Sequence, residues 1–249
     1  KINMETLVVS LQKSERRADF EKKFRGLNFK FFDAITPDDQ ENINFDDLIF
    51  RSIYGRNARK GEVGCTLSHF SILNAFINHS LDDWILILED DAIPEKEFFN
   101  FIKEFENNYK TENPEIILLG HSKTSKKHLL VQRIKQPLRN KINIKNIMFG
   151  ENNNITLCGT VGYLINKKAA YLITELKKNY WLADDWKMFS NLGIHVLHPQ
   201  KPIIWEDLNY ASSTENIVKY QHDFLNSPIK NIVHIIIGRY KFYNDNRKI

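Results

Sequence analysis

Residues 84–91 read Trp-Ile-Leu-Ile-Leu-Glu-Asp-Asp, five apolar residues followed directly by three carboxylates. A continuous apolar run of this length is typical of a strand that is buried on both faces of a parallel sheet. Grouping three negative charges gains the fold nothing, because like charges repel each other. The carboxyl end of such a strand is also where an open α/β sheet binds its ligand. The stretch therefore predicts a buried central strand that ends in a ligand-binding crevice.

Shorter apolar runs alternate with amphipathic segments on both sides of this strand. Further strands are expected at residues 6–11, 29–32, 116–119 and 155–165, and helices at 14–24, 95–109, 167–179 and from 61–64 onward. This alternation predicts an α/β fold with a mostly parallel central sheet flanked by helices. Residues 121–154 lose the pattern and are rich in Lys and Asn, which indicates a flexible insertion. We expect one domain over residues 1–228 and a basic, aromatic tail over 229–249.

The composition of the 249-residue chain excludes several classes of protein. With 42% hydrophobic and 27% charged residues, it is neither collagen-like nor disordered. No apolar run approaches the roughly 20 residues of a membrane-spanning helix. A net charge of +4 is too small to argue for a nucleic-acid binder. Cys65 and Cys158 form no CxxC pair, so we expect no zinc site and a reducing, cytoplasmic setting.

The three carboxylates Glu89, Asp90 and Asp91 have two interpretations. A divalent cation would relieve their repulsion, and hard oxygen ligands suit Mg²⁺ or Mn²⁺, which commonly join carboxylates to substrate phosphates. The implied substrate is then a diphosphate. Alternatively, the three residues form a solvated acidic turn before the next helix, whose N-terminus favours negative charge. Their spacing alone does not decide between the two.

Six short motifs, one of which contains this cluster, lie along the chain. They are 7–11 (LVVSL) with Arg16-Arg17, 31–35 (FFDAI), 61–69 (GEVGCTLSH), 88–91 (LEDD), 159–165 (GTVGYLI) and 184–186 (DDW). In this order and at this spacing, over roughly residues 4–215, the sequence resembles glycosyltransferase family 25. That family includes bacterial lipooligosaccharide β-galactosyltransferases and, more distantly, collagen galactosyltransferases.

The resemblance implies a GT-A-like nucleotide-sugar-binding fold, a UDP-sugar donor and inversion at the anomeric carbon. It implies that Asp91 ligates Mn²⁺ or Mg²⁺ together with the donor diphosphate, and that Glu89 lies nearer the ribose and adds to the metal ligands. The residues expected to bind the donor are Ser10, Arg16, Asp33, Ser68, His69, Glu89, Asp90, Gly159, Thr160 and Gly162. For several of them a structural role competes: a solvated helix face for Arg16, a hydrogen-bonded core histidine for His69, and a strand bulge for the glycines.

An inverting transfer also needs a base for the acceptor hydroxyl, on the opposite face of the donor sugar. Asp184 and Asp185 are the candidates. Asp185 aligns better with the single Asp that the family places before a helix, so it is expected to be the base. Asp184 would hold an acceptor hydroxyl or tune the pKa of the base. Its alternative role is a helix N-cap, which is a common use of Asp.

The last part of the chain supplies further candidates without a spacing argument to choose among them. The possible third metal ligands are His195, His198 and His222, and the possible acceptor-side residues are Glu206, Asp207, Ser212 and Ser213. The tail 229–249 is basic, aromatic and amphipathic, and such a segment can lie on an anionic membrane surface, where a lipid-linked acceptor would be found. Alternatively, it docks on the core of the protein itself.

These expectations combine into one function with two rivals. The expected protein is a metal-dependent, inverting glycosyltransferase that moves a hexose, with galactose from UDP-galactose as first choice, to a terminal sugar of a lipooligosaccharide. It would be cytoplasmic, with possible peripheral contact to the inner membrane, and would bind no nucleic acid. The rivals are a metal-dependent hydrolase of nucleotide diphosphates and a catalytically silent nucleotide-sugar-binding module.

Overall fold

The computed structural model describes residues 4–37, 44–124, 126–152, 157–176, 178–208 and 228–245. The strands are β1 (Glu5–Ser10), β2 (Lys30–Asp33), β3 (Trp84–Glu89), β4 (Ala92–Pro94), β5 (Glu115–Leu118), β6 (Arg139–Ile144), β7 (Ile147–Glu151), β8 (Gly162–Asn166), β9 (His195–Pro199) and β10 (Ile204–Glu206). The α-helices are α1 (Arg16–Lys23), α2 (Asp47–Tyr54), α3 (Lys60–His79), α4 (Lys96–Asn108), α5 (Leu129–Lys135), α6 (Lys167–Thr174), α7 (Trp186–Asn191) and α8 (Pro228–Asp245). A short 3-10 helix, η2 (Lys126–His128), precedes α5.

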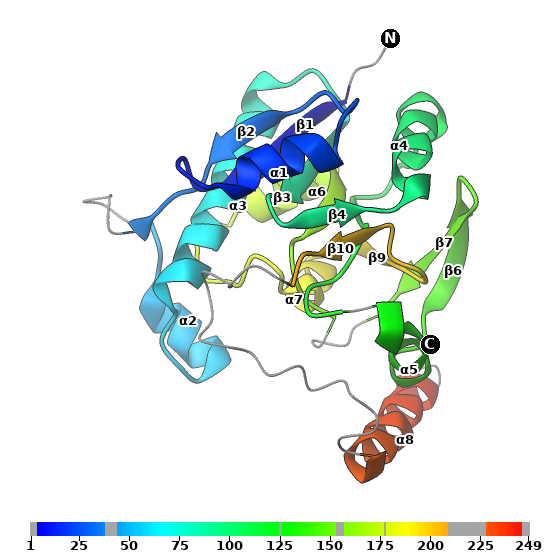
Figure 1. Cartoon of the computed structure of the whole chain (residues 1–249). Helices are drawn as coiled ribbons and strands as arrows, with labels where there is room; N and C mark the ends of the chain where they lie inside the picture. Colours follow the sequence, from blue (N-terminus) through cyan, green and yellow to red (C-terminus); the bar gives the residue numbers. More distant parts are fainter. Residues whose placement is uncertain are drawn as a thin grey trace.

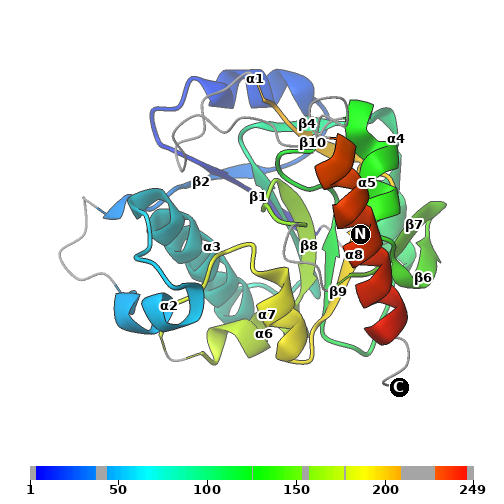
Figure 2. The same ribbon diagram turned by 90° about the horizontal axis from the view of Figure 1, so that it is seen from below.

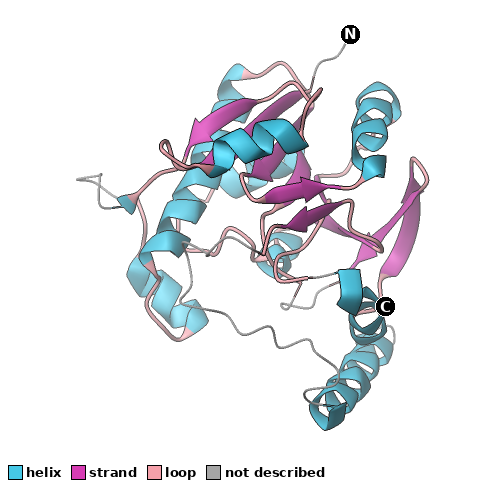
Figure 3. Cartoon of the chain, viewed as in Figure 1, coloured by secondary structure: helices cyan, strands magenta, loops and turns pink. Residues whose placement is uncertain are grey.

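Eight strands form one central sheet in the order β2-β1-β3-β8-β5-β9-β7-β6. The pairs β1–β2, β1–β3 and β5–β9 are parallel, whereas β8 is antiparallel to both of its neighbours and β7 is antiparallel to β6 and β9. Six of the eight strands therefore share one direction, and β7 and β8 oppose them. Strands occupy the centre of the molecule and helices its outside (Figure 3). The α/β class and the helix-flanked sheet are confirmed.

Strand β3 lies at the centre of the core, as its apolar run predicts. Its residues 84–88 are all buried, and alternate side chains point to opposite faces because the side-chain period of a strand is two. Leu86 and Leu88 pack with Phe side chains of α1 and α4 on one face. Ile85 and Ile87 pack with α3, α6 and α7 on the other face (Figure 2). Helices therefore cover the strand on both sides.

The segment 121–154, where the sequence pattern is lost, contains regular structure. Strands β6 and β7 form a hairpin that extends the central sheet through the pairing of β7 with β9. Lys145 and Asn146 make the turn with positive φ angles of 49° and 66°. Two consecutive positive φ values are typical of the two-residue hairpin turn that matches the twist of a sheet. Residues 139–151 are thus part of the sheet, which the sequence analysis did not predict.

A second, two-stranded sheet brings the late part of the chain to the end of β3. Strand β4 follows Asp91 directly and pairs in antiparallel register with β10, which places Glu206 opposite Ala92. The backbone N–H of Asp207 donates to the carbonyl oxygen of Asp91 at 2.7 Å. The carboxylates of residues 89–91 and Glu206 therefore meet, although 115 residues separate Asp91 from Glu206.

No helix in the described ranges combines the length and the hydropathy that crossing a bilayer requires.

Candidate active site

A cleft of about 1200 Å³ opens at the carboxyl ends of β1 and β3. It is bounded by the start of α1, the first half of α3, residues 157–160 and the segment that leads into α7. Both predicted groups of carboxylates line it, the cluster at residues 89–91 and the pair at 184–185. The other predicted residues that line it are Ser10, Arg16, Ser68, Gly159, Thr160 and Glu206. The two acidic groups therefore line one cavity.

Asp90 anchors the loop between β1 and α1. Its Oδ2 accepts hydrogen bonds from the hydroxyls of Ser10, at 2.7 Å, and Ser14, at 2.9 Å. The guanidinium of Arg16 lies 3.3 Å from Asp90 Oδ1 and 3.4 Å from Asp91 Oδ2. Because both oxygens of Asp90 are engaged with this loop, the residue holds the cleft wall in place, and Arg16 is the member of the group that faces both carboxylates.

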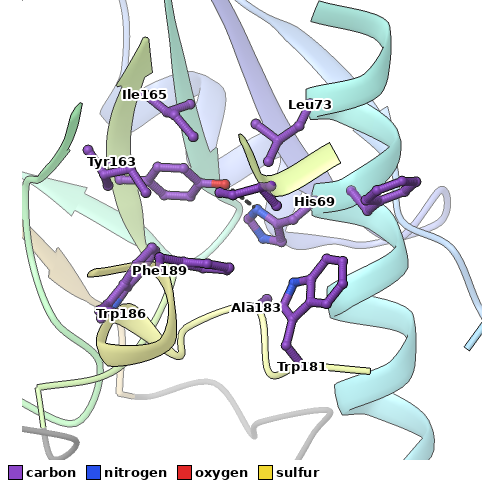
Figure 4. Close-up of a pocket in the computed structure, with 11 residues that line it drawn as sticks. His69, Leu73, Tyr163, Ile165, Trp181, Ala183, Trp186 and Phe189 are labelled. Atoms are coloured by element: carbon purple, nitrogen blue, oxygen red, sulfur yellow. Dashed lines mark hydrogen bonds between the residues drawn. The ribbon is translucent and has the colours of Figure 1, made fainter. Parts of the chain in front are cut away.

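A buried network of hydrogen-bonding side chains holds Glu89 in position. The hydroxyl of Thr160 donates to Glu89 Oε1, and His69 Nε2 lies 3.7 Å from the same oxygen. The other ring nitrogen of His69 is 2.7 Å from the hydroxyl of Tyr163 (Figure 4). Burial raises the pKa of Glu89, but His69 and Thr160 outweigh it and bring the pKa below its ordinary value. Cys65, His69 and Glu89 also offer ligand atoms within 4.8 Å of one another.

The surroundings of Asp91 shift its pKa in the opposite direction to that of Glu89. Burial and the negative charges of Glu89 and Glu206 raise its pKa well above the ordinary value. Its Oδ1 is buried and has no hydrogen-bond partner among the described residues. A buried carboxylate oxygen without a partner is costly unless a ligand satisfies it. A divalent cation would satisfy this oxygen and offset the repulsion among the three carboxylates, so the donor set fits a hard metal ion.

Gly159 and Thr160 connect the two carboxylate groups. The Thr160 hydroxyl bonds to Glu89, and the backbone N–H of Gly159 donates to Asp184 Oδ2 at 2.7 Å. Gly159 has a φ of +98°, and an added Cβ would lie 2.0 Å from Ser122 Oγ. Both facts require glycine here, since other residues adopt this conformation at a cost and the space is already filled.

We expect Gly159→Ala to lower the free energy of unfolding by about 3 kcal/mol, because it adds a steric clash to backbone strain. The control is Gly193→Ala, whose φ is +85° but whose Cβ meets nothing within 4 Å. It should cost only about 1 kcal/mol. Urea unfolding of both variants measures the difference, and equal losses would contradict the role of Ser122 as a barrier.

The adjacent aspartates 184 and 185 have different partners. Asp185 is the N-cap of α7, since its Oδ1 accepts from the backbone N–H of Met188 at 2.9 Å. Its Oδ2 accepts from the hydroxyl of Tyr54 at 2.6 Å. The alternative that made Asp184 the helix cap is therefore wrong, because the helix begins one residue later. Burial and the charges of Glu89 and Asp185 raise the pKa of Asp184. The hydrogen bond from the Gly159 N–H lowers this pKa, but the net shift is upward.

Three residues predicted to bind the donor, Asp33, His69 and Gly162, lie outside the cleft lining. Asp33 ends β2 and pairs with Arg17, and its side chain is 57% exposed. Gly162 is buried in β8, where an added Cβ would lie 2.9 Å from the Leu88 side chain. Gly162 thus allows β8 to pack against β3, and this close packing explains the glycine without a ligand. His69 lies beneath the cleft and reaches it only through Glu89.

Two of the three histidines proposed as third metal ligands, His195 and His198, are outside the cleft lining. His195 is at the start of β9 and pairs with Glu151. His198 is fully buried, and its Nδ1 lies 3.0 Å from His121 Nε2 in a stacked pair. His222, together with Ser212 and Ser213, lies outside the described residues. Asp207 pairs with Lys23 at 2.7 Å. Among the late residues, Glu206 is the one that lines the cleft beside Asp91.

The buried histidine pair predicts a pH-dependent stability. Burial lowers the pKa of His121 from 6.5 to about 4 and that of His198 well below its usual range. As the pH falls from 6.5 towards 4, the unfolded chain binds protons that the folded chain excludes, so stability decreases. For His121 alone the loss is about 3 kcal/mol by pH 4.

Urea unfolding from pH 7 to pH 4.5 measures this effect. The double variant His121→Leu/His198→Leu should show a smaller pH slope than the natural protein. The control variant His195→Gln, on the same strand as His198 but with a half-exposed ring, should keep the natural slope. Identical slopes for the double variant and the natural protein would contradict the assignment.

Sequence reasoning missed two contributors to the site. Tyr54, at the end of α2, lines the cleft and holds Asp185 from 131 residues away. Lys123, whose backbone N–H donates to Glu206 at 2.5 Å, also lines it. Neither belongs to a recognisable motif. The amphipathic pattern of residues 47–54 was the available signal for a helix that ends in a tyrosine.

Comparisons with known proteins found a matching family model and two similar proteins of bacteria. The model of glycosyltransferase family 25 (LPS biosynthesis protein) matches residues 3–188. The lacto-N-neotetraose biosynthesis glycosyltransferase LgtE of Neisseria meningitidis serogroup B is 25% identical, over 84% of this chain and 76% of that protein. The lipooligosaccharide biosynthesis protein lex-1 of Haemophilus influenzae is 27% identical, over 71% of this chain and 65% of lex-1.

One solved structure is similar at a lower level. A glycosyltransferase involved in glycosylating the major capsid of PBCV-1 covers 84% of this chain with a TM-score of 0.40 and 9% sequence identity.

Proposed function

The chain belongs to glycosyltransferase family 25, and from this premise we propose that it transfers a hexose from a UDP-sugar with inversion. Galactose from UDP-galactose is the proposed donor group, and a terminal sugar of a lipid-linked lipooligosaccharide is the proposed acceptor. The observation that carries the proposal is that the carboxylates at 89–91 and at 184–185 line one cleft and are joined through Gly159 and Thr160. One cavity would therefore hold the cation-binding group, the base and the donor sugar.

Asp91, Glu206 and Glu89 would hold a divalent cation, Mn²⁺ or Mg²⁺. Their proximity is supported by the raised pKa of Asp91, which burial causes first and the charges of Glu89 and Glu206 increase. When bound, the ion would neutralise negative charge on the leaving diphosphate. The Thr160 hydroxyl and His69 keep Glu89 ionised and in position beneath the donor. Glu206 replaces the three histidines as the proposed late ligand.

Arg16 is the proposed partner of the donor diphosphate within the protein. Its guanidinium lies between Asp90 and Asp91 at 3.3 Å and 3.4 Å, which are long for charge-assisted hydrogen bonds. A guanidinium can bind phosphate oxygens through a planar fork of donors. Ser10 and Ser14 hold Asp90 through Oδ2, so Asp90 would keep its position if Arg16 turned from Oδ1 to a phosphate.

Asp184 is the residue that we propose as the base. Burial and the charge of Glu89 raise the pKa of Asp184. The raised pKa lies nearer to neutral pH, where a general base is most effective. The Gly159 N–H fixes its Oδ2 at 2.7 Å and so orients the carboxylate. Asp185, whose two oxygens serve the α7 cap and Tyr54, would position Asp184. This reverses the two roles that the sequence analysis preferred.

The acceptor would enter from the side of the cleft beyond Asp184. That side is lined by Ile53, Tyr54 and Arg56 around the end of α2, and by Lys187 and Asn191 on α7. Aromatic, cationic and amide groups suit a sugar, which offers hydroxyls to bond and an apolar ring face to cover. An acceptor there would present its hydroxyl to Asp184.

The test is a panel of UDP-sugars, with and without Mn²⁺, in which UDP release is measured against a panel of glycoside acceptors. We expect release with UDP-galactose only when both Mn²⁺ and a β-glycoside acceptor are present. Release that ignores the acceptor would indicate the rival hydrolase. UDP binding without release from any sugar would indicate the catalytically silent module.

A further inference from the structure

Helix α8 presents an apolar stripe to solvent. The stripe consists of Ile229, Ile232, Val233, Ile236, Ile237 and Tyr240, which are between 45% and 78% exposed. Their spacing of three and four residues places all six on one face of the helix. A helix of a globular protein normally turns such a face towards the core, so its exposure needs an explanation.

The stripe is distinct from the surface by which α8 contacts the rest of the protein. Helix α8 lies beside α5 in both views (Figures 1 and 2). An added Cβ on Gly238 would lie 2.3 Å from the carbonyl oxygen of Lys135, so the two helices approach closely at that point. Ile235, Gly238 and Arg239 are only partly exposed. The helix therefore packs on α5 through one face and leaves its more apolar face open.

The neighbouring helix α5 exposes two further apolar side chains. Leu130 is 68% exposed and Ile134 is 37% exposed. Together with the stripe of α8 they add up to eight large apolar side chains on two adjoining helices. Single exposed apolar residues need no explanation, but six of them along one face of a helix mark an interaction site. We call these eight residues the α5–α8 surface.

The charge of the sequence indicates what covers this surface. Residues 228–249 contain five Lys and Arg against one acidic residue, so they hold the whole formal net charge of +4 of the chain. A second copy of the chain would bring the same positive segment face to face with itself, and like charges disfavour that contact. An anionic lipid bilayer offers complementary charge and an apolar layer for the stripe.

We propose that the α5–α8 surface binds the surface of an anionic lipid bilayer. Helix α8 lies in the plane of the interface, its apolar stripe enters the boundary between headgroups and acyl chains, and the positive charge of the segment 228–249 attracts anionic headgroups. This assigns a partner to the protein and does not depend on the identity of the donor sugar. If the proposed acceptor is lipid-linked, the same contact would keep the cleft close to it.

Vesicle flotation of the full chain tests the proposal. Vesicles of phosphatidylcholine alone are compared with vesicles that also contain phosphatidylglycerol. We expect the natural protein to float with the anionic vesicles and to be released from them by high salt. The variant Ile232→Ser/Ile236→Ser should bind at least about tenfold more weakly, because two exposed isoleucines no longer enter the lipid. The control Leu81→Ser, at a residue that is 99% exposed outside this surface, should bind like the natural protein.

Three outcomes would overturn the proposal: no binding of the natural protein to anionic vesicles, equal binding by the double variant, or a dimer in solution that the double variant dissociates. The last result would assign the surface to a second copy. UDP release with a soluble acceptor should be unchanged in the double variant, so failure of this proposal and failure of the proposed function are distinguishable. Since the replaced side chains are exposed, their loss should leave the unfolding transition unchanged.

Discussion

Asp91→Asn is expected to reduce sugar transfer by roughly 10³-fold, because charge stabilisation by a bound metal ion contributes several kcal/mol to such reactions. The same change should raise the free energy of unfolding by about 1 kcal/mol, since it removes a buried negative charge from beside two others. Activity and stability would then move in opposite directions. Substitution of a residue with only a structural role would lower activity and stability together.

Two measurements check this prediction, the initial rate of UDP release and urea unfolding, each with and without Mn²⁺. Mn²⁺ should stabilise the natural protein against unfolding and leave Asp91→Asn unaffected. The control Asp19→Asn removes a half-exposed carboxylate on α1 that pairs with Lys22 at 3.4 Å, and it should change neither quantity. Transfer near the natural rate by Asp91→Asn, with metal present, would remove the metal role.

Asp184→Asn and Asp185→Asn should separate the base from the residue that positions it. Loss of a general base lowers turnover by roughly 10²- to 10⁴-fold, and we expect this of Asp184→Asn with UDP affinity retained. An Asn at 184 can still accept the Gly159 N–H, so the segment 159–160 should keep its place. Asp185→Asn loses part of the α7 cap and of the Tyr54 bond, which should cost about 1 kcal/mol of stability.

The pH profile provides the readout that a structural role would not change. The natural protein should lose turnover as the pH falls through the raised pKa of Asp184, because the carboxylate becomes protonated. Asp185→Asn should keep this acidic limb at a somewhat reduced rate. If Asp185→Asn loses turnover as severely as Asp184→Asn, or if only Asp185→Asn does, the assignment of Asp184 as base is wrong. Tyr54→Phe should resemble Asp185→Asn, since it removes the same hydrogen bond.

The central part of the fold could be predicted because its signals are local. The run 84–88 had to be buried on both faces, and the helices before and after it showed clear amphipathic spacing. The hairpin β6–β7 could not be predicted in this way, because β6 is mostly exposed and polar and β7 joins the sheet by pairing with β9. The antiparallel direction of β8 could not be predicted either, since a buried strand is apolar whether it is parallel or antiparallel to its neighbours.

The candidate site was predicted where residue type and chain position sufficed. The spacing of the carboxylate cluster at the end of β3 left a solvated acidic turn as an alternative, and the buried Asp91 Oδ1, which has no hydrogen-bond partner among the described residues, favours the ligand role. The roles within the pair 184–185 depend on where α7 begins, and a shift of one residue exchanges the cap with the neighbouring aspartate. The place of Glu206 in the site depends on the pairing of β4 with β10, and that of Tyr54 depends on a contact across 131 residues. Tertiary contacts of this kind leave no sequence pattern.

The central claim is that the carboxylates at the end of β3 hold a divalent cation that binds the donor diphosphate, in a cleft shared with Asp184. Crystals grown with UDP and Mn²⁺ test it most directly through the anomalous signal of manganese. The account predicts one strong peak at the Asp91 carboxylate, next to the diphosphate of UDP. A diphosphate bound in the cleft without manganese, or manganese bound away from Asp91, would contradict it.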